Sequence, residues 1–287
     1  MAAKPSASEP AAQTATRQQL NQMEQAWNDG APLIKRWLGE ATLAMLSMAN
    51  VKPGAHVLDV AAGAGGQTLD IAERVGPRGF VLANDLSPDI LRFAKRQAAA
   101  AGHQNVEILA SDGENLQIED ARFDAVVCRM SLMLFLDPLQ GLREMKRVLK
   151  PDGGVCTMVF SAPDNNPCVA TLMSIALQHA GLAARDPYQP GGLFSLGKLG
   201  LIDDLFSQAG LRAIATTRIA APFKLPTARD YVDFVRASAG LVAQIVQRLE
   251  PAKAQAAWAD MEQALSRFET TDGWVGPNEL LLTAARR

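Results

Sequence analysis

The stretch from Val57 to Gln67 constrains the fold of this chain more than any other. It starts as a short apolar strand and runs through small residues into an amphipathic helix pattern that begins at Thr68. A strand, a glycine-rich turn and a helix, in this order, open the nucleotide site of doubly wound α/β sheets. The stretch therefore predicts such a sheet with a ligand at its first strand. The alternative is a turn of small residues that only packs a helix against a sheet.

Asp59 gives this turn its chemical character. It lies just before the small residues Ala61, Gly63 and Gly65. Glycine lets the backbone approach a ligand closely, because it has no Cβ. A carboxylate here would repel a pyrophosphate but attract an ammonium group, such as that of S-adenosylmethionine. The dinucleotide spacing G-x-G-x-x-G is met only if Ala61 stands as its first member.

Two further acidic residues follow predicted strands. Asp85 comes after the strand predicted over 80–84, about 20 residues beyond the glycine turn, where a carboxylate can bind a ribose diol. Asp112 and Gly113 come after the strand predicted over 106–109, where an acidic side chain and the next N–H can bind an adenine edge. These positions favour an adenosine ligand. Asp85 alone would suit a nicotinamide dinucleotide equally well. It could also be an exposed aspartate in a turn with no ligand.

The rest of the chain predicts alternating strands and helices. Further strands are expected at 123–128, 155–160, 212–219 and 279–284, and helices at 88–101, 139–149, 167–179, 199–209 and within 226–268. A helical segment over 19–50, broken near Asn28, precedes them. Residues 1–18 have almost no large apolar side chain, so we expect a disordered tail.

The composition argues against several classes of protein. The net charge is −2 and like charges do not cluster, which gives no support to nucleic-acid binding. The cysteines Cys128, Cys156 and Cys168 lack C-x-x-C spacing and predict reduced thiols of a cytoplasmic protein, with no metal site. No apolar run approaches the roughly 20 residues of a membrane span. The expected partner is a small molecule, and a homodimer is left open.

These segments together resemble the class I S-adenosylmethionine-dependent methyltransferases, and within them the ubiquinone/menaquinone type. The resemblance covers about 50–220. The motifs that carry it are Val57–Gly65, Asn84–Leu91, Asp112–Leu116, Phe123–Arg129 and Arg147–Gly154. Ala61 departs from the glycine that many members have, and Met133 stands where quinone methyltransferases often carry histidine.

The resemblance implies a Rossmann-like α/β fold with a seven-stranded, mostly parallel sheet, helices on both faces, an antiparallel last strand and helical caps. Together with the composition, this predicts a tail over 1–18, an N-terminal helical cap over 19–50, a cofactor-binding core over 51–220 with a substrate cap at 161–196, a helical cap insertion over 221–275, and a final core strand over 276–287. The implied cofactor residues are Asp59 and Ala61, Gly63 and Gly65 for the methionine part, Asp85 for the ribose, Leu86, Asp112 and Gly113 for the adenine, and Arg129 for the methionine carboxylate or the substrate.

The acceptor side of the site is predicted to be apolar, which favours a lipophilic or aromatic small molecule. Its expected wall comprises Trp27, Met130, Leu132, Met133, Phe160, Met173 and Phe194. Methyl transfer needs mainly positioning of the acceptor in line, and a base only if the acceptor must lose a proton. His179 is the histidine expected in a cap, and therefore the weak candidate for that base. Two alternatives are a protein of this fold that binds the cofactor without methylating, such as a cyclase or regulator, and a nicotinamide oxidoreductase.

Overall fold

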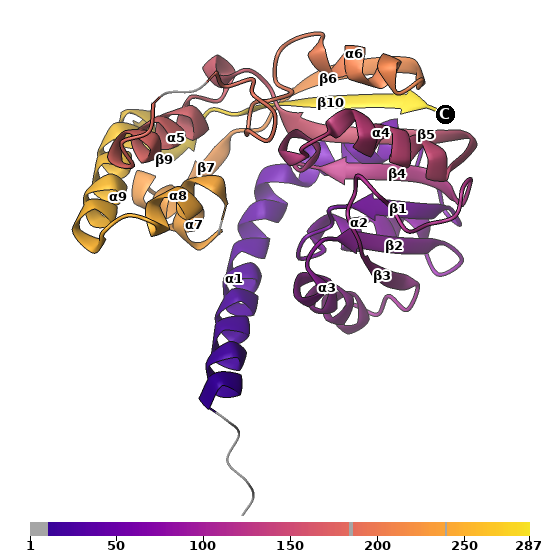
Figure 1. Cartoon of the computed structure of the whole chain (residues 1–287), viewed down its shortest axis with the longest axis horizontal. Helices are drawn as coiled ribbons and strands as arrows, with labels where there is room; N and C mark the ends of the chain where they lie inside the picture. The colour runs from indigo at the N-terminus through magenta and orange to yellow at the C-terminus, as the bar shows by residue number, and fades with distance from the viewer. Residues whose placement is uncertain (1–10, 184–185, 239) are drawn as a thin grey trace, which may run out of the picture.

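A seven-stranded sheet forms the centre of the protein (Figure 1). The computed structural model describes residues 11–183, 186–238 and 240–287, with side chains from residue 28 onward. The strand order is β3-β2-β1-β4-β5-β10-β6. The strands are β1 (His56–Val60), β2 (Phe80–Asp85), β3 (Val106–Ala110), β4 (Phe123–Arg129), β5 (Leu149–Phe160), β6 (Arg212–Ala220) and β10 (Glu279–Arg286).

The pairing of the last strand distinguishes this sheet. β10 lies between β5 and β6 and runs antiparallel to both, whereas β1 to β5 pair in parallel. β1 and β4 consist largely of buried apolar residues, as expected for strands covered on both faces. The predicted fold class, including the antiparallel last strand, is confirmed.

Helices surround this sheet and form a cap beside it (Figure 1). They are α1 (Ala11–Met48), α2 (Gly66–Val75), α3 (Pro88–Ala100), α4 (Pro138–Val148), α5 (Pro167–His179), α6 (Leu201–Gln208), α7 (Ala228–Ala237), α8 (Leu241–Gln247) and α9 (Pro251–Leu265), with short 3-10 turns η1 (Leu132–Leu134), η2 (Pro163–Asn165) and η3 (Ser266–Phe268). The Ser87 hydroxyl caps α3 by accepting from the Ile90 N–H, and Pro88 takes the first helical position.

Helix α1 differs from the sequence expectation in two ways. The tail was predicted over 1–18, but residues 11–18 already belong to α1, while residues 1–10 lie outside the described part. The predicted break near Asn28 is also wrong, because α1 continues through Gly30 and Pro32. Gln97 of α3 donates to the Asn28 side chain at 3.1 Å, and the ring of Phe234 lies beside Gly30. Packing thus outweighs the local cost of glycine and proline.

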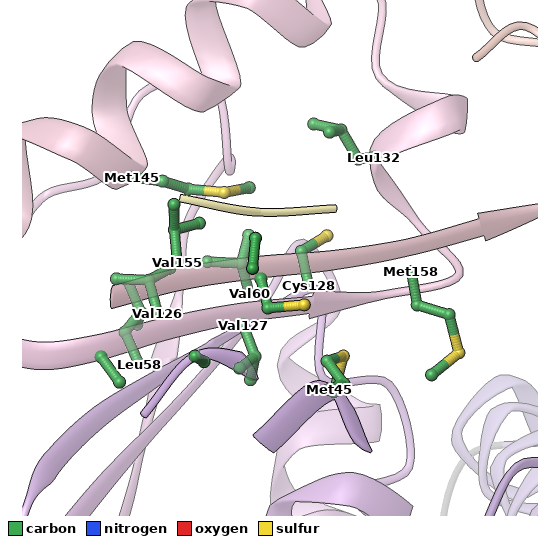
Figure 2. Packing of buried hydrophobic residues seen from close by; sticks show 14 of the residues in the cluster. Met45, Leu58, Val60, Val126, Val127, Cys128, Leu132, Met145, Val155 and Met158 are labelled. Atoms are coloured by element: carbon green, nitrogen blue, oxygen red, sulfur yellow. The ribbon is translucent and has the colours of Figure 1, made fainter. Parts of the chain in front are cut away.

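The main core lies between the sheet and its helices. Figure 2 shows Met45 of α1 and Met145 of α4 packed with side chains of β1, β4 and β5. The central strand residues of this cluster include Leu58, Val60, Val126, Val127, Cys128, Val155 and Met158.

All three cysteines of the chain are buried free thiols. Among the described residues, no helix combines the length and apolar character that crossing a membrane requires.

A second apolar cluster forms the cap beside the sheet, where Figure 1 draws α5 in red and α7, α8 and α9 in orange to yellow. It joins α5, α7, α8 and α9 to a small sheet of β7 (Phe223–Leu225), β9 (Gly273–Gly276) and β8 (Glu269–Thr270). Trp274 is fully buried in it and donates its indole N–H to the Leu265 carbonyl at 2.8 Å. The helical insertion predicted from the sequence therefore also contains short strands that the sequence did not predict.

Candidate functional site

The polar residues singled out in the sequence follow four neighbouring strands. Asp59, Asp85, Asp112 and Arg129 lie at or just beyond the ends of β1, β2, β3 and β4. These strands are parallel neighbours in the order β3-β2-β1-β4, so their carboxyl ends share one edge of the sheet. This edge is where open α/β sheets bind ligands. The topology therefore brings the predicted cofactor residues together along it.

Asp59 is fully buried beneath the glycine loop. Its Oδ2 accepts from the Thr68 hydroxyl at 2.6 Å and its Oδ1 from the Gln67 amide at 3.0 Å. Burial raises the pKa of Asp59 to about 6, against the lowering effects of these two hydrogen bonds and of Arg129. Asp59 thus fixes the first turn of α2. Its negative charge would act on a bound ammonium group through the electrostatic potential.

The glycine loop adopts backbone conformations that disfavour side chains. Gly63 and Gly65 have φ of 56° and 83°, and Ala61 also has a positive φ, 53°. A Cβ on Gly65 would lie 2.7 Å from the Ala94 Cβ, so α3 leaves it no room. The loop can therefore approach a ligand with backbone alone.

Asp85 connects the loops that follow β1 and β2. Its Oδ2 accepts from the Gly63 N–H at 3.0 Å, and its Oδ1 accepts from the Ser87 N–H at 3.1 Å. A carboxylate offers about four lone-pair positions, so two acceptor positions are left for a ligand diol. The sequence did not predict the contact with Gly63.

The residues predicted for the adenine lie on the next two loops. Leu86 is 72% exposed, unusual for a leucine, and offers an apolar surface at the sheet edge. Asp112 is exposed and accepts from the Glu114 N–H at 2.9 Å. Gly113 is buried against Phe135, and a Cβ there would lie 2.6 Å from the ring. A side chain at this position would therefore have to displace the Phe135 ring.

Arg129 comes from β4 and faces helix α1. Its Nη1 donates to the Thr42 hydroxyl at 2.9 Å. Its Nη2 lies near the first turn of α2, since a Cβ on Gly66 would be 3.2 Å from it. Burial lowers the pKa of Arg129, while Asp59 and Asp70 raise it. Among the described residues Arg129 forms no ion pair, so several of its N–H donors are left for a ligand.

The residues predicted for the acceptor divide into two groups. Met133, Phe160 and Phe194 are buried in the sheet core, as is Leu132. Met130 is half-buried at the end of β4 with a φ of 58°, a strained conformation for a bulky residue.

The remaining predicted acceptor residues do not lie in that core. Met173 packs against the cap cluster, and the side chain of Trp27 lies outside the described residues. Trp37 of α1 was not among the predicted site residues. Its ring lies 6.2 Å from that of Phe160 and 4.0 Å from that of Phe223.

His179 has a partner that explains its presence. Its Nε2 lies 2.7 Å from Asp260 Oδ2, which joins the last turn of α5 to α9. Pro167 begins α5 and His179 ends it, so about 18 Å of helix separate them at 1.5 Å per residue. This geometry favours a contact between helices over the predicted catalytic role.

Three further residues hold the site and were not predicted from the sequence. Gln67, Thr68 and Thr42 are polar and almost fully buried, and each binds a charged site residue. Their signal in the sequence is a polar side chain at a helix position that otherwise faces the core. Such positions are rare unless the side chain has a partner.

The fold and site together define a class of protein, which comparisons with known structures support. A putative methyltransferase from Bacillus halodurans C-125 has a TM-score of 0.58 and 24% identity, and covers 85% of this chain and 97% of that one. The [4+2]-cyclase SpnF has a TM-score of 0.54 and 20% identity, over 86% of this chain and 79% of that one. These structures share the fold. The chain has the fold of the class I S-adenosylmethionine-dependent methyltransferases.

Sequence comparison gives a more specific similarity over part of the chain. Residues 37–177 match the model of the ubiE/COQ5 methyltransferase family. The ubiquinone/menaquinone biosynthesis C-methyltransferase UbiE of Hahella chejuensis is 36% identical over 121 residues, 42% of this chain and 49% of that protein. The demethylmenaquinone methyltransferase of Bacillus cytotoxicus is 36% identical over 129 residues, 45% and 53% of the two chains. The matched part of the chain is therefore similar to the ubiE/COQ5 methyltransferases, and the match spans about half the length of these relatives.

Proposed function

We propose that this protein transfers the methyl group of S-adenosylmethionine to a small lipophilic or aromatic acceptor. The observation that carries the proposal is the Asp85 carboxylate, which ties the glycine loop to the loop after β2 and keeps free acceptor positions at the sheet edge. An adenosine diol is the ligand chemistry that matches such a carboxylate.

The residues along the edge fit the whole cofactor. Leu86 offers an apolar surface for the adenine, and Asp112 with the Gly113 N–H matches its polar edge. Arg129 has free donors for the methionine carboxylate, and Asp59 supplies negative charge near the ammonium group. When bound, the cofactor supplies an activated methyl group. The protein then has to hold the acceptor in line and exclude water.

The acceptor class is inferred from the apolar residues near the same edge. Met130, Trp37 and Phe160 come from three different elements there. The relatives are named for ubiquinone and menaquinone biosynthesis, which supports a ring-containing lipophilic acceptor. Much of the cap, from α7 to β9, lies beyond the matched residues 37–177, so the acceptor itself can differ from theirs.

Thermal unfolding with three ligands tests the cofactor. S-adenosylmethionine and S-adenosylhomocysteine should stabilise the protein, by roughly 2.7 kcal/mol at 100 times the dissociation constant. NAD should not, and an equal shift with NAD would overturn the cofactor assignment.

Asp85→Ala should weaken S-adenosylmethionine binding about tenfold to several-hundred-fold, because it removes hydrogen bonds of about 1.5–3 kcal/mol each.

A turnover assay separates methyl transfer from binding alone. The protein is incubated with S-adenosylmethionine and a panel of hydroxylated aromatic and quinol acceptors, and S-adenosylhomocysteine is quantified. Release that depends on one acceptor supports the proposed function. Tight cofactor binding without release on any acceptor would instead favour a protein of this fold that does not methylate.

A further inference from the structure

Helix α1 carries a buried polar residue that faces the cofactor edge of the sheet. Thr42 is fully buried on a helix face whose other buried members are apolar, including Leu38, Ala41 and Met45. Its hydroxyl accepts the hydrogen bond from Arg129 Nη1 at 2.9 Å. These residues are 87 positions apart in the chain. The bond therefore links a helix outside the sheet to the end of β4.

The position of Arg129 explains what this bond achieves. The guanidinium is half-buried near the first turn of α2. Asp59 and Asp70 lie close enough to raise the pKa of Arg129, but neither forms an ion pair with it among the described residues. An arginine side chain is flexible and would gain from turning toward such a carboxylate. The Thr42 hydroxyl holds it away from both.

The contact between α1 and α2 is itself charged around this bond. Burial raises the pKa of Asp70 on α2, while Arg129 and Lys35 of α1 lower it. The positive groups that face Asp70 thus come from two different elements. Keeping Arg129 free for a ligand requires that Asp70 does not capture it.

We infer that Thr42 is a positioning residue, which directs the Arg129 guanidinium toward the carboxylate of the bound cofactor, so that helix α1 completes the cofactor site. This inference rests on the proposed function. Fixing the side chain before binding lowers the entropy lost when the ligand is bound. Thr42 should therefore affect the binding only of ligands that carry this carboxylate.

Calorimetric titration with S-adenosylhomocysteine tests the inference. Thr42→Val keeps the branched shape but removes the hydroxyl, and should weaken binding about tenfold, equivalent to about 1.4 kcal/mol. Thr42→Ser restores a hydroxyl and should bind within about threefold of the wild type. Ser47→Ala is the matched control, because the Ser47 hydroxyl lies on the same helix and contacts Leu43 and Arg74 instead.

A second ligand separates positioning from a general structural defect. 5′-Methylthioadenosine lacks the carboxylate, so Thr42→Val should bind it as the wild type does. Weakened binding of both ligands would show that Thr42 only supports the fold, and would overturn the inference. Thermal unfolding without ligand shows whether Thr42→Val is folded.

A double-mutant cycle completes the test. In an Arg129→Gln background, Thr42→Val should cause no further loss of S-adenosylhomocysteine affinity, because its target is gone. Additive losses would contradict the inference, as would unchanged binding by Thr42→Val alone. If the wild type binds neither ligand, the proposed function fails and the inference fails with it. If the wild type binds S-adenosylhomocysteine and Thr42→Val binds it equally well, the inference fails but the proposed function stands.

Discussion

Asp59 shows at the residue scale how burial sets a dependence on pH. Its pKa is raised to about 6 by burial, well above the 3.8 of a free aspartate. Protonated Asp59 therefore stabilises the folded state, fully so below about pH 4, and this contribution is lost as the pH rises through 6. The difference corresponds to about 3 kcal/mol. At neutral pH the folded protein carries a buried charge at a cost in stability.

Asp59→Asn should accordingly stabilise the protein without ligand. We expect a gain of up to about 3 kcal/mol at pH 8 that disappears toward pH 4, measured by urea unfolding at several pH values. The same variant should bind S-adenosylmethionine more weakly, because the negative charge near the ammonium group is gone. Equal stability of the wild type and Asp59→Asn at pH 8 would show that burying the Asp59 charge does not destabilise the folded state.

The sequence predicted single residues where chemistry and position coincide. Asp59 and Asp85 end or follow apolar strands, so the topology alone places them at the ligand edge. Thr42 and Gln67 could not be predicted in the same way. They lie in the C-terminal part of α1 and at the start of α2, and their partners depend on how the helices cross the sheet. That crossing is a property of packing, which no local pattern encodes.

At the scale of elements, the glycine loop allows a paired test of backbone strain. Ala61 has a φ of 53°, a conformation that costs a non-glycine residue roughly 1–2 kcal/mol. Ala61→Gly relieves this strain but gives the unfolded chain more conformational freedom, which offsets part of the gain. The variant should therefore be neutral or stabilise the protein by up to about 1 kcal/mol. Gly65→Ala should destabilise it, because the new Cβ meets Ala94 at 2.7 Å. Chemical denaturation measures both, and a fully stable Gly65→Ala variant would contradict the loop geometry.

The contact between α5 and α9 gives the prediction for His179. The pair with Asp260 is partly exposed, with side-chain exposures of 19% and 56%, and such pairs contribute about 0.2–1 kcal/mol. His179→Ala and Asp260→Asn should then each lower the melting temperature slightly. Their effects on turnover should be small and equal to one another. Both should keep S-adenosylmethionine affinity within about threefold. A loss of turnover in His179→Ala alone would restore its catalytic role.

Elements with strong periodicity and clear caps were predicted well, and those held by distant contacts were not. Ser87 and Pro88 mark the start of α3, as the sequence indicates. α1 passes through Gly30 and Pro32, and its neighbours there come from distant parts of the chain: Gln97 of α3 binds Asn28, and Phe234 of α7 lies beside Gly30. The strands β7, β8 and β9 are too short to show an alternating pattern, and the pairing of β7 with β9 joins residues far apart in the chain.

At the scale of the whole molecule, Trp37 joins the two apolar clusters. It contacts both the sheet core and the cap cluster. Its ring stacks on Phe223 of β7 at 4.0 Å, and its indole N–H donates to the Ala221 carbonyl at 2.7 Å. On the same helix, Thr42 binds Arg129 at the cofactor edge. α1 therefore contacts the parts proposed to bind the acceptor and the cofactor.

Trp37→Ala should uncouple the cap from the sheet domain. Truncation of a buried tryptophan costs about 3–5 kcal/mol, and Trp37 is half-buried, so we expect about 2–3 kcal/mol. Scanning calorimetry should show two transitions in place of one. S-adenosylhomocysteine should then raise only the transition of the sheet domain, because the residues proposed to bind it lie there.

Trp37→Phe provides the control for this change. Phenylalanine keeps an aromatic ring against Phe223 but loses the hydrogen bond to Ala221, worth about 1 kcal/mol. We expect a single transition at a slightly lower temperature, raised as a whole by S-adenosylhomocysteine. If Trp37→Ala also melts in one transition at the wild-type temperature, other contacts hold the cap. The acceptor and cofactor regions would then be coupled without α1.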